Sequence, residues 1–384
     1  MTTNNENINK ETKNLNVPHL RFPEFCGEWE MASLQDIATI NPKSAPLQNT
    51  FIYIDLEAVE KGELRKIQEI MREEAPSRAQ RVISNYDILF QCVRPYQKNN
   101  YIHRILNTSN QQWVASTGYA QIRTTESPNY IYHLLNTDGF NRKVIVRCTG
   151  SSYPAINSED LATIRFYFTP DKKEQLKISR LLDLLDKRIA TQNKIIEKLQ
   201  SLIKGIAQHC IKESTSGNTY VKLGDICQIT TGKLDANAQV DNGIYPFFTC
   251  AEQPFKIDSF AFDTEALLIS GNGANLGYIN YYNGKFNAYQ RTYVLDIFSE
   301  NIQYVKWALK VLLPKRIAIE KSSSNTPYIV LSTLSDLRLP IPNKSNQCHI
   351  AKLMQSLERK LSSQIALNGS YNKLKLYLLR QMFI

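Results

Sequence analysis

The sequence predicts an α+β protein with two similar mixed α/β domains and two long helices that pair as an antiparallel coiled coil. Several short motifs occur twice, 173 to 189 residues apart. The clearest pairs are Leu34–Ile37 with Leu223–Ile226, Trp113–Ser116 with Phe286–Tyr289, and Ser152–Ile156 with Asn325–Ile329. Each half then enters a stretch whose apolar residues are spaced alternately by four and three, which is typical of a coiled-coil seam. A repeated frame with different side chains predicts two related surfaces that contact different targets.

The chain of 384 residues is long enough for two or three domains. The predicted order is a disordered polar tail at 1–16, a first domain at 17–170, a central helix at 171–214, a second domain at 215–343 and a C-terminal helix at 344–384. Pro170 and Pro342 each stand just before a helix, where proline is tolerated. Each domain is therefore expected to be followed by a helix of its own.

Short apolar runs broken by turn residues predict strands inside the first domain, and one stretch has helical spacing. The predicted strands are Thr50–Ile54, Asp87–Phe90 and Lys143–Val146, and the predicted helix is Tyr130–Leu135. The second domain repeats this plan with a strand at Ala266–Ile269 and a helix at Ile302–Leu313.

The two long helices have matching seams. The central seam is predicted to contain Ile178, Leu182, Leu185, Ile189, Gln192, Ile196, Leu199, Ile203, Ile206 and Cys210. The C-terminal seam is predicted to contain Ile350, Met354, Leu357, Leu361, Gln364, Tyr371, Leu378 and Met382, with Asn368 and Lys375 interrupting it.

Gln192 and Gln364 hold matching places near the middles of helices of about 38 residues, which are about 57 Å long at 1.5 Å per residue. If the helices are antiparallel with their centres aligned, the two amides meet. Such a pair would fix the register, because a slipped alignment would set each amide against aliphatic carbon at a cost of roughly 1–3 kcal/mol. The alternative is that each glutamine is half exposed at the edge of the seam.

The net charge of +10 belongs to the helices. Residues 171–212 carry +5 and residues 344–384 carry +6, which leaves the rest of the chain at −1. Two interpretations stay open: ordinary solvated helix faces, or a positive rod that lies near a polyanion.

Seven cysteines and five histidines are scattered with no cluster at metal-ligand spacing, so no zinc site is expected. No stretch approaches about eighteen consecutive apolar residues, and the N-terminus lacks the basic and apolar parts of a secretory signal. These observations predict a cytoplasmic protein with free thiols and no membrane partner.

Antiparallel helices would place the two domains at opposite ends of a rod, related by a pseudo-twofold axis. Duplex DNA has local twofold axes, and paired readers match half-sites through that symmetry. A rod of ~57 Å is longer than the ~34–36 Å of one helical turn. The domains would therefore reach separated half-sites on double-stranded DNA.

The order domain, helix, domain, helix resembles the specificity subunits of type I restriction–modification systems, over almost the whole chain from about Val17. Four segments resemble the entry segment and the opening and later parts of a target-recognition domain: Leu20–Trp29, Leu223–Ile226 with Thr231–Lys233, Gly271–Gly277 and Ala288–Thr292. The first copy departs from the pattern at Asn41–Lys43 and Val93–Pro95, where the glycines of the second copy are missing.

The resemblance implies a non-catalytic DNA reader without a cofactor of its own. Each target-recognition domain would read one half of a bipartite asymmetric site, while the coiled coil sets the spacing and docks the modification subunits. The implied partners are two modification subunits that methylate adenine with S-adenosylmethionine and two restriction subunits, translocase-nucleases that use ATP and magnesium. The sequence is consistent with a non-catalytic role, because it has neither the Asn/Asp-Pro-Pro-aromatic motif of adenine methyltransferases nor a P-loop.

Candidate DNA contacts come from loops where the copies align but the side chains differ. They are Lys43, Arg94, Tyr96, Lys98, Thr117 and Tyr153 in the first copy, and Lys233, Asn272, Asn275, Gln290, Arg291 and Thr326 in the second. Arginine, asparagine and glutamine can make bidentate contacts to base edges, whereas lysine more often contacts phosphate. The alternative for each is an ordinary surface residue.

Two other functions stay open. The chain could be an orphan specificity subunit of a methylation-only complex, or a scaffold whose coiled coil joins two protein-binding domains. A self-contained nuclease or methyltransferase is disfavoured, because the motifs for that chemistry are missing.

Overall fold

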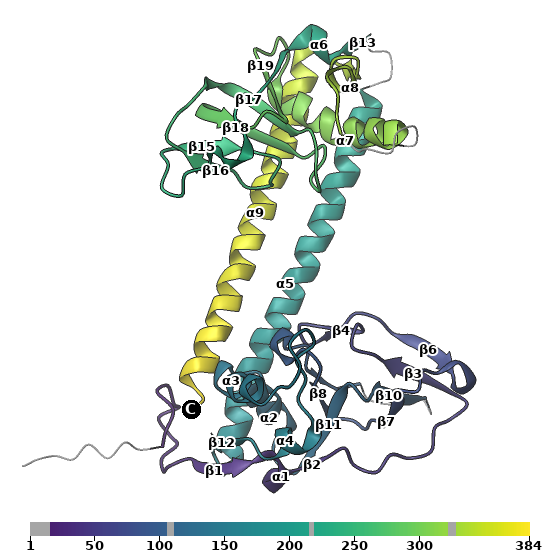
Figure 1. Cartoon of the computed structure of the whole chain (residues 1–384), viewed down its shortest axis with the longest axis vertical. Helices are drawn as coiled ribbons and strands as arrows, with labels where there is room; N and C mark the ends of the chain where they lie inside the picture. Colours follow the sequence, from purple (N-terminus) through teal and green to yellow (C-terminus); the bar gives the residue numbers. More distant parts are fainter. Residues whose placement is uncertain (1–15, 106–110, 215–218, 322–327) are drawn as a thin grey trace, which may run out of the picture. The chain divides into compact units, whose positions relative to one another are not determined.

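The computed structural model describes residues 16–105, 111–214, 219–321 and 328–384. Their contacts form two compact units: residues up to 191 together with 368–384, and residues 192–367. The predicted α+β fold class is confirmed, because each unit contains a mixed α/β head and parts of the two long helices (Figure 1). Of the predicted tail, 1–15 lies outside the described residues, and the carbonyl of Asn16 accepts a hydrogen bond from Trp29 N at 2.7 Å.

The first head, residues 30–168, is closed by antiparallel pairing of its first and last strands, β1 (Glu30–Ser33) and β12 (Arg165–Phe168). Between them lie two four-stranded sheets, ordered β2 (Ala38–Ile40), β11 (Tyr119–Thr124), β8 (Ile88–Gln91), β9 (Tyr101–Ile102), and β6 (Gln68–Met71), β3 (Thr50–Ile54), β10 (Gln112–Ser116), β7 (Ala79–Val82). The other elements are α1 (Leu34–Ile37), β4 (Val59–Glu60), β5 (Glu63–Leu64), the 3-10 helices η1 (Arg72–Glu74) and η2 (Pro95–Gln97), α2 (Pro128–Leu135), α3 (Asp138–Val146) and α4 (Ser158–Ala162).

The second head, residues 219–341, is closed in the same way by β13 (Thr219–Lys222) and β20 (Arg338–Ile341). Its central sheet has six strands, ordered β14 (Gln228–Thr231), β19 (Thr292–Asp296), β17 (Phe262–Ser270), β18 (Ile279–Ala288), β15 (Tyr245–Phe248) and β16 (Phe255–Ile257). The helices of this head are α6 (Leu223–Ile226), η3 (Ala236–Ala238), α7 (Ile302–Lys321) and α8 (Leu331–Ser335). Apolar residues of β17, β19 and α7 share one buried core.

The two heads repeat each other in their backbone contacts. Each contains the same isolated antiparallel bridge, between Val93 and Ala155 in the first head and between Asn272 and Tyr328 in the second. The neighbouring hydrogen bond is repeated as well, from Ile156 N to Cys92 O at 3.0 Å and from Ile329 N to Gly271 O at 2.8 Å. Both heads also contain one parallel strand pair, β3 with β10 and β15 with β18. The duplication indicated by short sequence motifs is therefore a duplication of structure.

One predicted strand is wrong: residues 143–146 form the last turn of α3. Thr137 caps this helix by accepting a hydrogen bond from Phe140 N at 3.2 Å. Phe140 and Val144, four residues apart, are its buried side chains, so a helical face covers the core. Burial of that face outweighs the strand preference of the β-branched residues at the helix end. The other predicted strands and helices of both heads are present.

The long helices α5 (Lys172–Glu213) and α9 (Lys344–Gln381) run antiparallel within each unit (Figure 1). In the first unit, Lys375 Nζ pairs with Asp186 Oδ1 at 2.6 Å, and Arg188 lies over the ring of Tyr371. The later residue of α5 thus contacts the earlier residue of α9, as antiparallel helices require. In the second unit the apolar cluster is formed by Leu199, Ile203 and Ile206 with Ile350, Met354, Leu357 and Leu361. All the predicted seam residues are buried or half-buried.

The hydrogen bond predicted between the two seam glutamines is present in the second unit. Gln192 Nε2 donates to Gln364 Oε1 at 2.7 Å and lies 3.2 Å from the backbone oxygen of Gln364. The Gln192 side chain is only 4% exposed, so its amide depends on this partner. Whether the pair sets the helix register stays a prediction.

Candidate nucleic-acid interface

The loop around η2 in the first head has an unusual backbone conformation at both ends. Arg94 and Lys98, the residues before and after η2, both lie in the left-handed region, with φ of 54° and 53°. Such a conformation carries a strain of about 1–3 kcal/mol for a non-glycine residue. Hydrogen bonds from Arg94 N to Pro154 O (2.8 Å) and from Asn99 N to Gln91 Oε1 (3.1 Å) hold the loop in place. The side chains of this loop therefore extend from a fixed backbone.

Arg94 and Tyr153, both predicted contacts, lie together at a hollow of about 740 Å³. The guanidinium carbon of Arg94 is 4.4 Å from the centroid of the Tyr153 ring, and Tyr153 is 63% exposed. Cationic groups are attracted to the face of an aromatic ring, so this contact orients the guanidinium. Arg65 and Arg78 line the same hollow, so three arginines from separate loops of the first head meet there.

The other predicted contacts of the first head lie on separate loops. Tyr96 is exposed in η2, and Lys43 is exposed between β2 and β3. Thr117 is half-buried in the turn between β10 and β11, where its N–H donates to the carbonyl of Arg78 at 2.9 Å. Thr117 is thus connected to the arginine-lined hollow through the backbone of Arg78.

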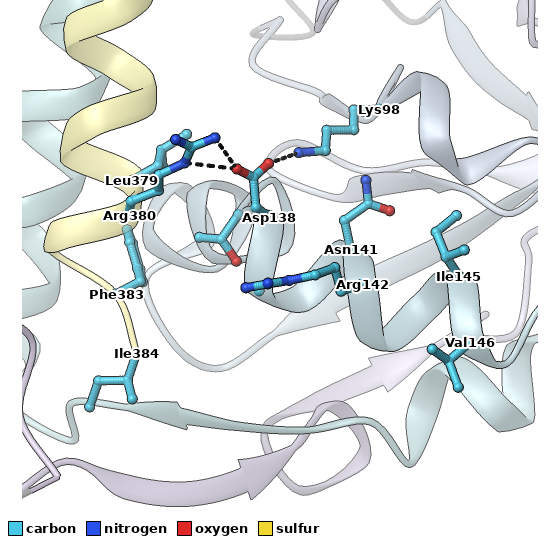
Figure 2. A pocket seen from close by; sticks show the side chains of 12 residues that line it. Lys98, Asp138, Asn141, Arg142, Ile145, Val146, Leu379, Arg380, Phe383 and Ile384 are labelled. Atoms are coloured by element: carbon cyan, nitrogen blue, oxygen red, sulfur yellow. Dashed lines mark hydrogen bonds and ion pairs between the residues drawn. The ribbon is translucent and has the colours of Figure 1, made fainter.

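Lys98 lies at a different hollow, of about 760 Å³, which Figure 2 shows. Its Nζ is 2.8 Å from Asp138 Oδ1, and Asp138 Oδ2 accepts a hydrogen bond from the guanidinium of Arg380, at the end of α9, at 2.9 Å. The hydrogen bond from Lys98, and after it that from Arg380, holds the pKa of Asp138 below its usual value. A DNA contact by Lys98 would therefore require this ion pair to open.

In the second head, the predicted loops meet through backbone hydrogen bonds. Gly271 N donates to Arg291 O at 2.8 Å, and Gln290 N donates to Leu234 O at 2.9 Å. These bonds join the loop after β14, the loop after β17 and the turn between β18 and β19. The structure therefore brings together most of the contacts predicted for this head.

The side chains on these joined loops differ in their exposure to solvent and in their hydrogen bonds. Lys233, Gln290 and Arg291 are exposed, Asn272 is half-buried at its bridge to Tyr328, and Asn275 Nδ2 donates to Cys250 O at 3.1 Å. Thr326, the remaining predicted contact, lies outside the described residues.

Two glycines explain how closely these loops approach each other. A Cβ at Gly232 would lie 1.9 Å from the carbonyl oxygen of Ala288, and a Cβ at Gly271 would lie 2.5 Å from that of Arg291. No side chain fits at either place without a backbone shift. The glycines of the second copy are thus required by the packing of its loops.

Arg65 and Arg78 were missed by the sequence comparison. They precede and follow β6, in a stretch that none of the repeated motifs reaches. Only the fold brings them to the hollow that Arg94 lines. Arg78 directly precedes β7, and its carbonyl accepts a hydrogen bond from Thr117 N. The next residue, Gly118, accepts from Cys92 N at 3.0 Å, two positions before Arg94. A high density of arginine between residues 65 and 81 is the one signal that the sequence offered.

Within the described ranges, no group of three histidine, cysteine, aspartate or glutamate residues is arranged to hold a metal ion. No helix in the described part of the chain combines the length and apolar character needed to cross a bilayer. Exposed arginine, lysine, amide and tyrosine side chains on fixed loops are instead the groups that proteins use to contact nucleic acid.

Two heads on one backbone frame, with different polar side chains on equivalent loops, define a protein class with paired recognition modules. The chain belongs to the type I restriction modification DNA specificity domain family, whose model matches residues 27–201 and 215–368. The two matches contain the two heads, so the family likeness has the same duplication as the structure.

Known specificity subunits resemble this chain either in sequence or in fold. The EcoDI type I restriction enzyme specificity subunit of Escherichia coli is 42% identical over 143 residues, which are 37% of this chain and 32% of that protein. The chain thus matches about a third of that relative's length. The crystal structure of the S subunit of a type I restriction-modification system from M. genitalium covers 96% of this chain and 99% of its own, with a TM-score of 0.67 and 16% identity. At that identity, the likeness shows the fold alone.

Proposed function

We propose that this chain is the DNA sequence-specificity subunit of a type I restriction–modification complex and that it catalyses no reaction itself. The observation that carries the proposal is the family match over both heads, together with the repetition of their backbone frame. Each head would read one half of a bipartite DNA site. Because the loops differ between the heads, the two halves would differ in sequence and the site would be asymmetric.

The long helices are proposed to set the distance between the two half-sites. Their antiparallel pairing, the ion pair between Lys375 and Asp186 and the hydrogen bond between Gln192 and Gln364 support this role. A paired helix resists bending better than a flexible linker, so the gap between the heads would be fixed in length. The positive charge of both helices would favour a position near the DNA phosphates.

Exposed apolar residues that repeat on the two long helices support the docking of two modification subunits. Leu181, Ile195 and Leu202 on α5 have counterparts 172 positions later on α9, namely Leu353, Leu367 and Leu374. These side chains are between 37% and 53% exposed and recur at multiples of seven residues. The position between the first two is Arg188 on α5 and Lys360 on α9, so each helix offers separate exposed apolar residues. Their matching spacing on the two helices suits two copies of one partner.

The reactions of the complex are assigned to the partners. The modification subunits would methylate adenine with S-adenosylmethionine, and two restriction subunits would use ATP and magnesium for translocation and cleavage. Described residues of this chain contribute no metal cluster, and its sequence has no P-loop. A complex with modification subunits alone is the second candidate, and a protein scaffold is the third.

The proposal is tested by sequencing DNA methylation in the host, in a strain that lacks this gene and in the same strain after complementation. We expect adenine methylation at one bipartite asymmetric motif, lost on deletion and restored by the gene. An unchanged pattern of methylation would contradict the proposal. Failure to cleave unmethylated motifs would favour the methylation-only complex, and equal binding of random and genomic duplexes by the purified complex would favour the scaffold.

A further inference from the structure

We propose that Arg94, stacked on Tyr153, is a guanine-reading residue of the first head. This inference rests on the proposed function. It specifies that the half-site of the first head contains a guanine and that Arg94 binds the major-groove edge of this base. The inference depends on the backbone of Arg94, on the position of its guanidinium and on the partners available to that group.

The backbone at Arg94 is the first line of support. The shared bridges align Val93 with Asn272, so Arg94 stands where the second head has Gly273. Gly273 has φ of +78° and Arg94 has φ of 54°, and both lie in the left-handed region. The frame demands this conformation, which glycine adopts without strain and arginine does not. Strained residues cluster at functional sites, so a strained arginine at this half-buried loop position motivates a functional role for its side chain.

The guanidinium is held but not neutralised. Some arginines of the first unit are paired with carboxylates, as Arg21 is with Glu174 at 2.7 Å and Arg123 with Asp87 at 2.8 Å. Glu57 and Glu60 line the same hollow as Arg94, but Glu60 is paired with Arg65 at 3.5 Å. No carboxylate within the described ranges forms an ion pair with Arg94, whose contact is the Tyr153 ring. An aromatic partner fixes the position of the guanidinium and uses none of its N–H groups.

Guanine is the base that such a group fits. Two N–H groups of one arginine match O6 and N7 of guanine in the major groove, and this is the commonest specific contact of arginine with DNA. A guanidinium held by a ring before binding loses less rotamer freedom than a free one, so the contact is favoured. Phosphate can also accept two N–H groups, and it is therefore the outcome that the experiment must separate.

The experiment uses the purified complex with its modification subunits and a duplex that carries the methylated motif. Each guanine of the first half-site is replaced in turn by 7-deazaguanine, which lacks the N7 acceptor. We expect one position at which this change weakens binding by the wild-type complex about 5–20-fold, as expected for part of a bidentate contact. The Arg94→Gly complex should bind weakly from the start and lose nothing more at that position.

The choice of variants separates base reading from folding and from charge. Arg94→Gly copies the residue found in the second head and removes the left-handed strain, so a fall in thermal stability is not expected. Arg94→Lys keeps the charge and should lose the preference for guanine. Lys43→Ala, which removes an exposed charge elsewhere in the same head, should weaken binding to all duplexes equally.

Two results would overturn the inference. In one, the loss of binding caused by 7-deazaguanine and the loss caused by Arg94→Gly add at every guanine of the first half-site. No guanine would then share a contact with Arg94. The other is an equal loss by Arg94→Gly on every sequence, which would identify a phosphate contact. A wild-type complex with no preference for the methylated motif would instead contradict the proposed function.

Discussion

Arg291 lies in the turn between β18 and β19 with an exposed side chain and an engaged backbone. Its carbonyl accepts hydrogen bonds from Gly271 N at 2.8 Å and from Cys250 Sγ at 3.6 Å. Because the loop is held through backbone atoms, removal of the side chain should leave the surface intact. Arg291 is therefore the position at which a contact of the second head can be tested with least disturbance.

We predict that Arg291→Ala relaxes specificity only in the half-site read by the second head. A lost bidentate contact should reduce discrimination at one base pair by about 1–3 kcal/mol. Competition binding with duplexes that carry every single-base change in both half-sites measures this effect. Arg338→Ala, an exposed arginine on β20 in the same head, is the control and should change neither half-site. Equal weakening on all sequences would instead identify Arg291 as a phosphate contact.

Residue types could be predicted from the sequence more easily than their partners. The aligned loops indicated Arg94 and Tyr153, and the structure places their side chains together. They also indicated Lys98, but could not show its ion pair, because Asp138 is forty positions away and comes from a different helix. Arg78 reaches the hollow lined by Arg94 and Tyr153 only through contacts between segments distant in sequence. Such contacts leave no local sequence pattern.

At the scale of elements, the coiled-coil seam was predictable and the end of α3 was not. A seam has a short sequence period that repeats over many turns, so each apolar residue supports the same interpretation. The run at residues 143–146 has no such support, because strand preference and helical burial compete within four residues. At these residues the helix forms because its buried face packs against the core of the head, whatever the local strand preference.

We predict that Gln192→Leu destabilises the paired helices by about 1–2 kcal/mol, because Gln364 then keeps a half-buried amide without its partner. Replacing both glutamines by leucine should restore stability, since two apolar side chains then meet. The midpoint of urea unfolding, followed by helical circular dichroism, measures both effects. Gln200→Leu, at an exposed position of the same helix, is the control. If the single and double variants unfold alike, the hydrogen bond contributes little.

At the scale of the whole molecule, the proposed function makes the length of the two helices a determinant of the DNA site. Insertion of seven residues into α5 and seven at the matching place in α9 adds two helical turns to each and keeps the seam in phase. The added length of about 10.5 Å corresponds to roughly three base pairs at 3.4 Å each.

We predict that this double insertion lengthens the spacer of the methylated motif by about three base pairs and leaves both half-sites unchanged. Methylation sequencing of the complemented strain reads the spacer and the half-sites together. An insertion into α5 alone should abolish methylation, because the seams of α5 and α9 would no longer match. A double insertion that leaves the spacer unchanged would show that the helices do not measure the site.

The closure of each head by its own first and last strands has a consequence for how such proteins can change. Glu30 faces Phe168 across β1 and β12, and Thr219 faces Ile341 across β13 and β20. A module whose chain enters and leaves side by side can be exchanged as a cassette, since the new insert only has to begin and end on neighbouring strands. Under the proposed function, recombination at these borders would give a host a new target sequence in a single event, without redesign of the helices or of the subunits proposed to dock on them.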